Sequence, residues 1–88
     1  MKYQVIIDSS AEKDLVKFPA RDIKKISAVI DSLSENPKPI GVKKLHASNE
    51  NLYRVRAGDY RIIYAVAEEI KIVNVRRIRH RKDVYRGL

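Results

Sequence analysis

The stretch Leu52–Val66, LYRVRAGDYRIIYAV, constrains the fold more than any other part of this chain. Gly58-Asp59 is a typical two-residue turn, and it separates two runs in which apolar and polar residues alternate. A loop of these two residues predicts an antiparallel hairpin with Arg56 directly opposite Arg61. The same register pairs Ala57 with Tyr60, Val55 with Ile62 and Tyr53 with Tyr64.

This register gives the hairpin one apolar face and one basic face, because directly opposed residues share a face. The apolar face collects Tyr53, Val55, Ala57, Tyr60, Ile62, Tyr64 and Val66. The basic face collects Arg54, Arg56 and Arg61, with Leu52 and Ile63 at its edge. Like charges directly opposite each other destabilise a sheet. A broken local rule inside an otherwise consistent pattern is typical of a functional site, so we expect this face to bind an anion. For Arg54 and Arg56 the alternative is a solvated face of an ordinary amphipathic strand.

The charge of the chain is unevenly placed. Its formal net charge is +8 over 88 residues. Residues 1–51 hold nine Lys/Arg against seven Asp/Glu, a net of +2, and residues 52–88 hold ten against four, a net of +6. A basic half-surface is typical of proteins that bind phosphate-rich or acidic partners. The alternative is a charged surface that only keeps a small protein soluble.

Length and composition favour a single globular domain over residues 1–88. The chain has no cysteine, which excludes disulfides and thiolate metal sites. No run approaches the roughly eighteen apolar residues of a membrane span. The first residues, MKYQVII, are typical of a strand and not of a signal peptide. We therefore expect a cytoplasmic protein without a membrane partner.

The first half of the chain predicts a strand and two helices. Lys2–Ile7 is rich in strand-forming residues, and Ser9 with Glu12 matches a capping box that begins a short helix. This helix is expected to end at Phe18-Pro19, and a second helix, with Pro19 in its first turn, is expected to end by Asn36-Pro37. An apolar stripe at helical spacing runs along the second helix. It consists of Ile23, Ile26, Ile30 and Leu33.

The second half predicts a loop over residues 37–51 and strands at about 52–57, 60–67 and 70–78. If Glu68-Glu69 forms another two-residue turn, Tyr64 opposes Val73, Ile62 opposes Val75 and Arg76 opposes Arg61. The tail that begins at Arg79 is expected to start irregular. The predicted fold is α+β, in the order β-α-α-β-β-β. An N-terminal strand and a helical hairpin pack on one face of a small antiparallel sheet, and the other face stays open.

An open basic sheet face suits the backbone of a nucleic acid. Arginine contacts phosphate through a planar fork and stays charged at any cellular pH. The tail adds Arg79, His80, Arg81 and Tyr85. A tyrosine beside such a face can stack on an unpaired base. A histidine can exchange a proton near neutral pH, although a simple exposed position in the tail is the alternative for His80.

The blocks LYRVRAGDYRIIY (Leu52–Tyr64) and RHRKDVY (Arg79–Tyr85) resemble the RelE-type toxins of the RelE/ParE toxin–antitoxin superfamily. The resemblance extends over the whole chain in length and element order. It implies a small sheet-and-helix fold that cleaves messenger RNA in the ribosomal A site without a metal or another cofactor. It also implies an antitoxin that wraps the toxin in a hetero-oligomeric complex.

The resemblance further implies roles for individual residues. Arg54 and Arg56 match two basic strand residues that grip the substrate, and Arg61 matches the arginine that holds the scissile phosphate. Arg81 matches the tail arginine, or Arg79 does so if the tail alignment shifts. Tyr85 matches the tyrosine that stacks on the base beside the cut. We expect further RNA contacts from Lys43, Lys44, Arg76 and Arg79.

The implied reaction is attack of a ribose 2′-OH on the adjacent phosphate. Preplaced guanidinium groups would stabilise the charge that develops in the transition state. The identity of the base stays open, because arginines stand where the best-described relative has lysines. Three possibilities remain. Arg56 acts only electrostatically, or His80 supplies the proton transfer, or the chemistry is substrate-assisted on the ribosome.

Other functions remain open on the same fold. One alternative is a ParE-like toxin that poisons DNA gyrase, and another is an inactive basic binding module. We expect no metal site, because most carboxylates lie on the predicted helices and two separate histidines do not form a ligand set.

Overall fold

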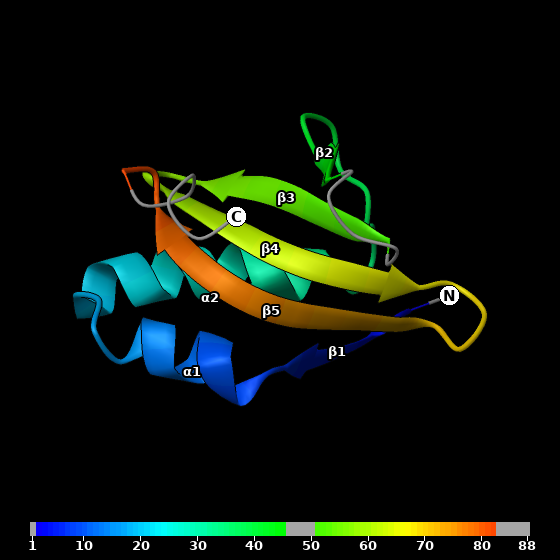
Figure 1. Ribbon diagram of the computed structural model, residues 1–88, viewed down its shortest axis with the longest axis horizontal. Coiled ribbons are helices and arrows are strands. Elements are labelled where there is room, and N and C mark those ends of the chain that lie inside the picture. Colours follow the sequence, from blue (N-terminus) through cyan, green and yellow to red (C-terminus); the bar gives the residue numbers. More distant parts are fainter. Residues whose placement is uncertain (1, 46–50, 83–88) are drawn as a thin grey trace.

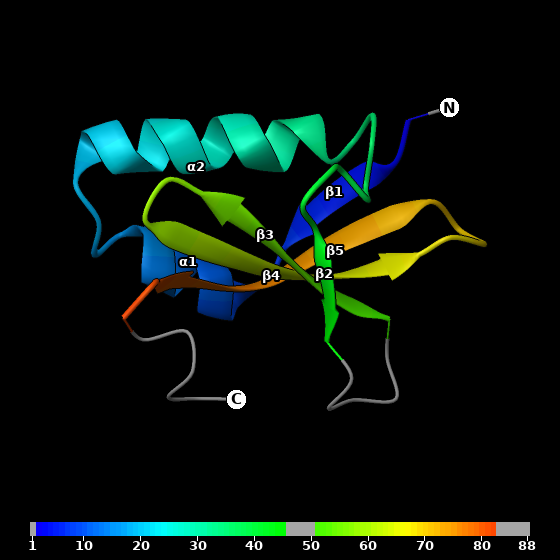
Figure 2. The same ribbon diagram turned by 90° about the horizontal axis from the view of Figure 1, so that it is seen from above.

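The computed structural model of the chain describes residues 2–45 and 51–82. The elements are β1 (Gln4–Ile7), α1 (Ser9–Leu15), α2 (Ala20–Ser32), β2 (Lys43–Leu45), β3 (Leu52–Ala57), β4 (Tyr60–Ala67) and β5 (Ile72–His80). The strands form one sheet in the order β1-β5-β4-β3-β2 (Figure 1). The α2 helix runs along one face of this sheet, and no helix of the described residues covers the other face (Figure 2). The predicted α+β class is confirmed.

Two features of the sheet differ from the prediction. The sheet is mixed, because β1 pairs with β5 in parallel while the other pairs are antiparallel. A parallel pair needs a crossover connection, and the helices and the other strands together provide one. The second difference is β2, which pairs with β3 inside the segment predicted to be a loop.

The predicted hairpin is confirmed in both its turn and its register. Gly58 and Asp59 form the loop, and Arg56 lies opposite Arg61. Every residue assigned to the apolar face is buried. The α2 helix packs on this face through Ile26 and Ile30, with Leu33 at its C-cap, whereas Ile23 of the predicted stripe is only half-buried. The apolar alternation of the strands and the stripe of the helix therefore form one core.

The predicted pairing of the last two strands is wrong. Ala67 pairs with Ile72, so the connecting loop has four residues and not two. With this loop Tyr64 lies opposite Val75, and a β-bulge between Ile63 and Tyr64 shifts the register by one more residue from Ile63 onward. As a result Arg79, and not Arg76, lies opposite Arg61. The strand also continues to His80, where an irregular tail was expected.

The helix starts also differ by one residue from the prediction. Asp8, and not Ser9, occupies the N-cap position of α1, and no side chain caps this helix. The Asp8 carboxylate instead accepts a hydrogen bond from Asn74 at 2.9 Å. Pro19 takes the N-cap position of α2, so Ala20 is its first residue.

The α1 helix supports the edge of β5 that β1 leaves exposed. β1 pairs only with Ile72–Val75. Farther along β5, the Asp14 carboxylate of α1 accepts a hydrogen bond from the Ile78 N–H at 2.9 Å. The same carboxylate accepts two hydrogen bonds from Arg77, at 3.0 Å from Nε and 3.1 Å from Nη2. A side chain thus replaces a strand partner and fixes the end of β5 that carries Arg79.

Candidate functional site

The β3–β4 hairpin holds two arginines side by side on the open face of the sheet. Arg56 and Arg61 are directly opposed. Arg56 Nε donates a hydrogen bond to the Gly58 carbonyl at 3.1 Å, and Arg61 Nη1 reaches the same oxygen at 3.5 Å. Arg61 Nη1 also donates to the Tyr60 carbonyl at 3.1 Å. The carbonyl dipoles of the turn therefore orient both guanidinium groups and offset part of their repulsion.

Neighbouring strands extend this basic face in both directions. On β5, Arg79 lies opposite Arg61. On β2, Lys43 lies opposite Arg54. Since directly opposed residues share a face and residues two apart on a strand do too, all five cations project from the same side of the sheet. We call Lys43, Arg54, Arg56, Arg61 and Arg79 the basic face.

Four residues of the basic face surround a hollow of about 430 Å³. Its lining consists of Ile40, Gly41, Lys43, Arg54, Val55, Arg56 and Arg61. No carboxylate of the described residues is part of this lining. Closely spaced cations give this lining a positive potential, which attracts anions such as phosphate.

Two other predicted RNA contacts lie away from this hollow. Lys44 is opposite Tyr53 and so projects from the other side of β2 than Lys43. Arg76 forms an ion pair with Asp8, 3.7 Å from Nε to Oδ2, and a hydrogen bond with Asn74. It lines a separate hollow near the β4–β5 loop.

The structure does not bring His80 together with the arginines. His80 lies opposite Tyr60, whose side chain belongs to the core face. The two rings meet edge to face with centroids 5.4 Å apart. His80 Nδ1 accepts a hydrogen bond from the Lys82 N–H at 3.3 Å. The sheet therefore separates this imidazole from the hollow.

The two other tail residues predicted for the site are Arg81 and Tyr85. Arg81 is exposed, and its backbone N–H donates to the Asp59 carbonyl at 2.7 Å, which fastens the end of β5 to the β3–β4 turn. Tyr85 lies outside the described residues.

Sequence reasoning missed the contribution of Asp14. Burial raises the pKa of its carboxyl, but the hydrogen bonds from Arg77 and the Ile78 N–H, with the charges of Arg77 and Arg79, outweigh burial and lower the pKa below its ordinary value of 3.8. The carboxylate is thus held ionised at the edge of β5. The available signal was an acidic residue next to Leu15 in a short helix, which is too weak to indicate a partner 63 residues away.

A family model described as the ParE toxin of the type II toxin–antitoxin system parDE matches residues 5–85. The chain is 36% identical over 90 residues to the putative toxin RelE1 of Methanocaldococcus jannaschii, covering 99% of both proteins. It is 33% identical over 90 residues to the toxin RelG of Mycobacterium tuberculosis, covering 98% of this chain and 99% of RelG. This chain belongs to the RelE/ParE superfamily as a RelE-type toxin.

Solved structures agree with this assignment. The RelE-type toxin superposes on a chain of the archaeal RelE–RelB complex from Pyrococcus horikoshii with a TM-score of 0.81 and 32% identity, covering 92% of this chain and 97% of that one. A chain of the RelBE2 toxin–antitoxin complex from Mycobacterium tuberculosis also gives a TM-score of 0.81, at 27% identity, with coverages of 91% and 99%. Residues 2–45 and 51–82 of the toxin contain no helix that is long and apolar enough to span a membrane.

Proposed function

We propose that this RelE-type toxin is an endoribonuclease that cleaves messenger RNA in the ribosomal A site and so inhibits translation. The observation that carries the proposal is the row Arg56–Arg61–Arg79, which crosses three adjacent strands on the open face beside the 430 Å³ hollow. A row of guanidinium groups fits successive phosphates of a single strand, and the hollow fits the phosphate that reacts.

In the proposed reaction a ribose 2′-oxygen bonds to the adjacent phosphorus, and the bond from phosphorus to the 5′-oxygen breaks. The 2′-hydroxyl loses its proton, and the 5′-oxygen leaves with one. The pentavalent transition state carries more negative charge on its nonbridging oxygens than the ground state. Arg56 and Arg61, oriented by the turn carbonyl, would therefore bind the transition state more tightly than the substrate. This charge stabilisation requires no metal ion.

Proton transfer is the step to which the basic face contributes least. Arginine keeps its proton at any cellular pH, so Arg56 is a poor base. His80 lies against Tyr60 on the opposite side of the sheet, which argues against its acting on an RNA held by the arginines. We therefore assign the arginines a positioning and electrostatic role, with proton transfer left to groups of the substrate or the ribosome. Tyr85 stays a proposed stacking partner for the base beside the cut.

The tail arginine of the site is proposed to be Arg79. Arg79 is directly opposite Arg61, whereas Arg81 lies beyond the last paired residue of β5. Arg81 and Lys43 are then peripheral phosphate contacts, and Arg76 is engaged with Asp8.

An antitoxin is the proposed protein partner. The solved relatives from Pyrococcus horikoshii and Mycobacterium tuberculosis are toxin–antitoxin complexes. The net charge of +8 favours an acidic or amphipathic antitoxin segment, because such a segment complements the basic face. Covering this face would block RNA, so the same charges explain both toxicity and neutralisation.

The test is induction of the toxin in cells, followed by primer extension on translated messages. The parent protein should give cuts inside codons, and Arg61→Ala should abolish them. Lys24→Ala removes an exposed cation from α2, on the other face of the sheet, and should cut like the parent. Intact messages with DNA damage would overturn the proposal in favour of a ParE-like gyrase poison. Intact messages without DNA damage would indicate a binding module.

A further inference from the structure

The connection between α2 and β2 places one isoleucine in solvent at the rim of the hollow. The exposed fraction of Ile40 is 105%, and this residue lines the hollow together with Lys43 and Arg54. Val55 is the other large apolar residue of the lining, and it is buried in the core. Among the described residues the hollow therefore combines four cations with one exposed aliphatic residue.

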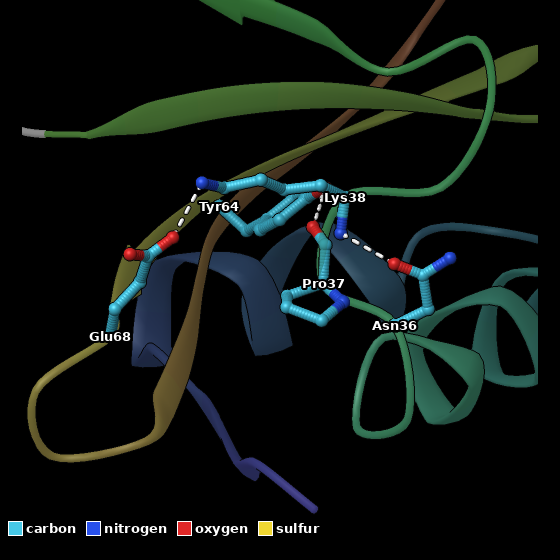
Figure 3. A network of polar contacts seen from close by, with 5 residues as sticks. All are labelled: Asn36, Pro37, Lys38, Tyr64 and Glu68. Carbon is cyan, nitrogen blue, oxygen red and sulfur yellow. Dashed lines mark hydrogen bonds and ion pairs between the residues drawn. The ribbon is translucent and has the colours of Figure 1, made fainter.

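The loop that carries Ile40 is held in place by hydrogen bonds, so the exposure of Ile40 does not come from a flexible backbone. The buried Tyr64 hydroxyl donates a hydrogen bond to the Pro37 carbonyl at 2.6 Å (Figure 3). Lys38 bonds through its backbone N–H to Asn36 Oδ1 at 3.2 Å and through its Nζ to Glu68 (Figure 3). The Lys38 ammonium also lies 5.4 Å from the centroid of the Tyr53 ring. The start of the loop is thus attached to the core, to the β4–β5 loop and to the end of α2.

A tight turn then presents Ile40 itself. The Val42 N–H donates to the Pro39 carbonyl at 3.1 Å, which closes a four-residue turn around Ile40 and Gly41. Gly41 has a φ of +90°, the value that a type II turn requires at its third position and that only glycine adopts readily. Ile40 is therefore held outward by a preorganised turn between two fixed ends.

We propose that Ile40 packs against the nucleobase next to the phosphate held in the hollow, and so forms the apolar wall of a nucleotide site. The inference rests on the proposed RNA-cleaving function and adds a specificity-determining residue to it. A nucleotide presents an anionic phosphate and the apolar face of a base close together, which matches cations beside one aliphatic group. An amphipathic peptide would need several apolar contacts at helical spacing, and within residues 2–45 and 51–82 the lining offers one exposed apolar residue.

The contact can be observed directly with the full chain in solution. The probe is a 2′-O-methyl trinucleotide, which lacks the nucleophilic hydroxyl and cannot be cleaved, titrated into protein carrying ¹³C-labelled isoleucine methyl groups. Ring currents of a packed base should shift the Ile40 δ1-methyl signal upfield, with assignment by Ile40→Val. The methyl of Ile70, exposed on the β4–β5 loop, should not move. An abasic analogue with the same phosphates should shift the Arg61 amide but leave the Ile40 methyl in place.

A second experiment measures the affinity for the trinucleotide after truncation of one of two exposed apolar residues. Ile40→Ala should weaken trinucleotide binding roughly five- to tenfold, since the shorter side chain loses about half of the apolar surface that isoleucine would bury against the base. It should leave binding of the abasic analogue unchanged. Val16→Ala truncates another exposed apolar side chain, at the C-cap of α1, and should change neither affinity.

The outcomes separate this inference from the proposed function. A trinucleotide that shifts the Arg61 amide but not the Ile40 methyl overturns the inference and leaves the proposed function standing. A trinucleotide that shifts neither overturns the inference, and the proposed function then fails as well if primer extension shows no cuts. Unchanged trinucleotide affinity in Ile40→Ala, together with weaker antitoxin binding, overturns the inference in favour of a peptide contact.

Discussion

Arg56 and Arg61 face each other across the β3–β4 hairpin, and both guanidinium groups donate to the carbonyl oxygen of Gly58. Like charges at directly opposed positions destabilise a sheet by a few tenths to about 1 kcal/mol. A shared acceptor offsets this repulsion in part, but a carbonyl carries no net charge, and no carboxylate of the described residues lines the hollow beside the pair. The pair is therefore better explained by an anionic ligand than by the stability of the hairpin.

Removal of one arginine of the pair should stabilise the toxin while it reduces cleavage. Arg56→Thr places a good strand former opposite Arg61 and relieves the repulsion, so we expect a gain of about 0.5 kcal/mol in the free energy of unfolding. Urea denaturation measures this gain, and primer extension measures the lost cleavage. Lys44→Thr, whose partner Tyr53 is uncharged, should give no such gain. A less stable Arg56→Thr protein would contradict the repulsion argument.

The turn that holds the pair depends on the backbone of Gly58, whose φ is +61°. Side chains other than those of glycine, asparagine and aspartate adopt this conformation poorly, so Gly58→Ala should cost about 1 kcal/mol. Nothing within 4 Å would meet the added Cβ, so the loss would come from the backbone alone. Gly58→Asn, which tolerates the left-handed region, should retain most of the stability and cleavage. Thermal unfolding and cleavage assays of the two variants check this expectation.

The hairpin could be predicted from sequence because its determinants are local. Gly58-Asp59 specifies the loop length, and alternating residues on both sides agree on one buried face. The next pairing could not be predicted in this way. The four-residue loop after Ala67 and the bulge at Ile63 and Tyr64 leave no comparable pattern, so Arg76 was predicted in the place that Arg79 takes.

Other differences arise from long-range contacts. The end of β5 is ordered to His80 because Asp14, far away in the chain, binds the Ile78 N–H. The three-residue strand β2 pairs with the free edge of β3, and so short a strand has no alternation long enough to recognise. The basic face was therefore predictable as a set of arginines on β3 and β4, while its members from β2 and β5 required the tertiary structure.

The Asp14 contact should make stability depend on pH in a definite direction. The folded-state pKa lies below 3.8, so the carboxylate contributes its full stabilisation above the unfolded-state pKa and loses it as the pH falls through the lower folded value. Asp14→Asn leaves Arg77 without its charged partner and should lower the free energy of unfolding by about 2–3 kcal/mol near neutral pH. This difference should be constant down to about pH 5 and shrink below the ordinary value.

Denaturation of both proteins across this pH range measures the effect. The matched control is Asp31→Asn on the exposed face of α2, which should change stability by less than about 0.5 kcal/mol at every pH. A stability difference between the parent and Asp14→Asn that stayed constant into acid would show that the charge of Asp14 contributes nothing.

Tyr64 links the core to the loop that presents Ile40. Tyr64→Phe removes only the hydroxyl that donates to the Pro37 carbonyl, so we expect a loss of about 1 kcal/mol and faster amide hydrogen exchange at Val42, whose N–H closes the turn. Tyr60→Phe is the control, because the Tyr60 hydroxyl donates to Asp22 of α2 at 2.9 Å and not to the loop that carries Ile40. If Val42 exchanged equally in both variants, the Tyr64 hydroxyl would not be bracing the turn.

In the proposed site the reacting phosphate is contacted by Arg79 of β5 and not by Arg81 of the tail. The register places Arg79 opposite Arg61, and Arg81 lies beyond the strand. Removing a donor aimed at transition-state charge typically reduces the rate by about 10²–10³-fold, so Arg79→Ala should fall in this range. Arg81→Ala should lose about tenfold, as expected for a peripheral phosphate contact. Arg76→Ala, which removes a cation already paired with Asp8, should cleave within about threefold of the parent. Single-turnover cleavage of ribosome-bound message measures all three. A larger loss in Arg81→Ala than in Arg79→Ala would mean that the RNA follows the end of the hairpin and not the row of guanidinium groups across the sheet.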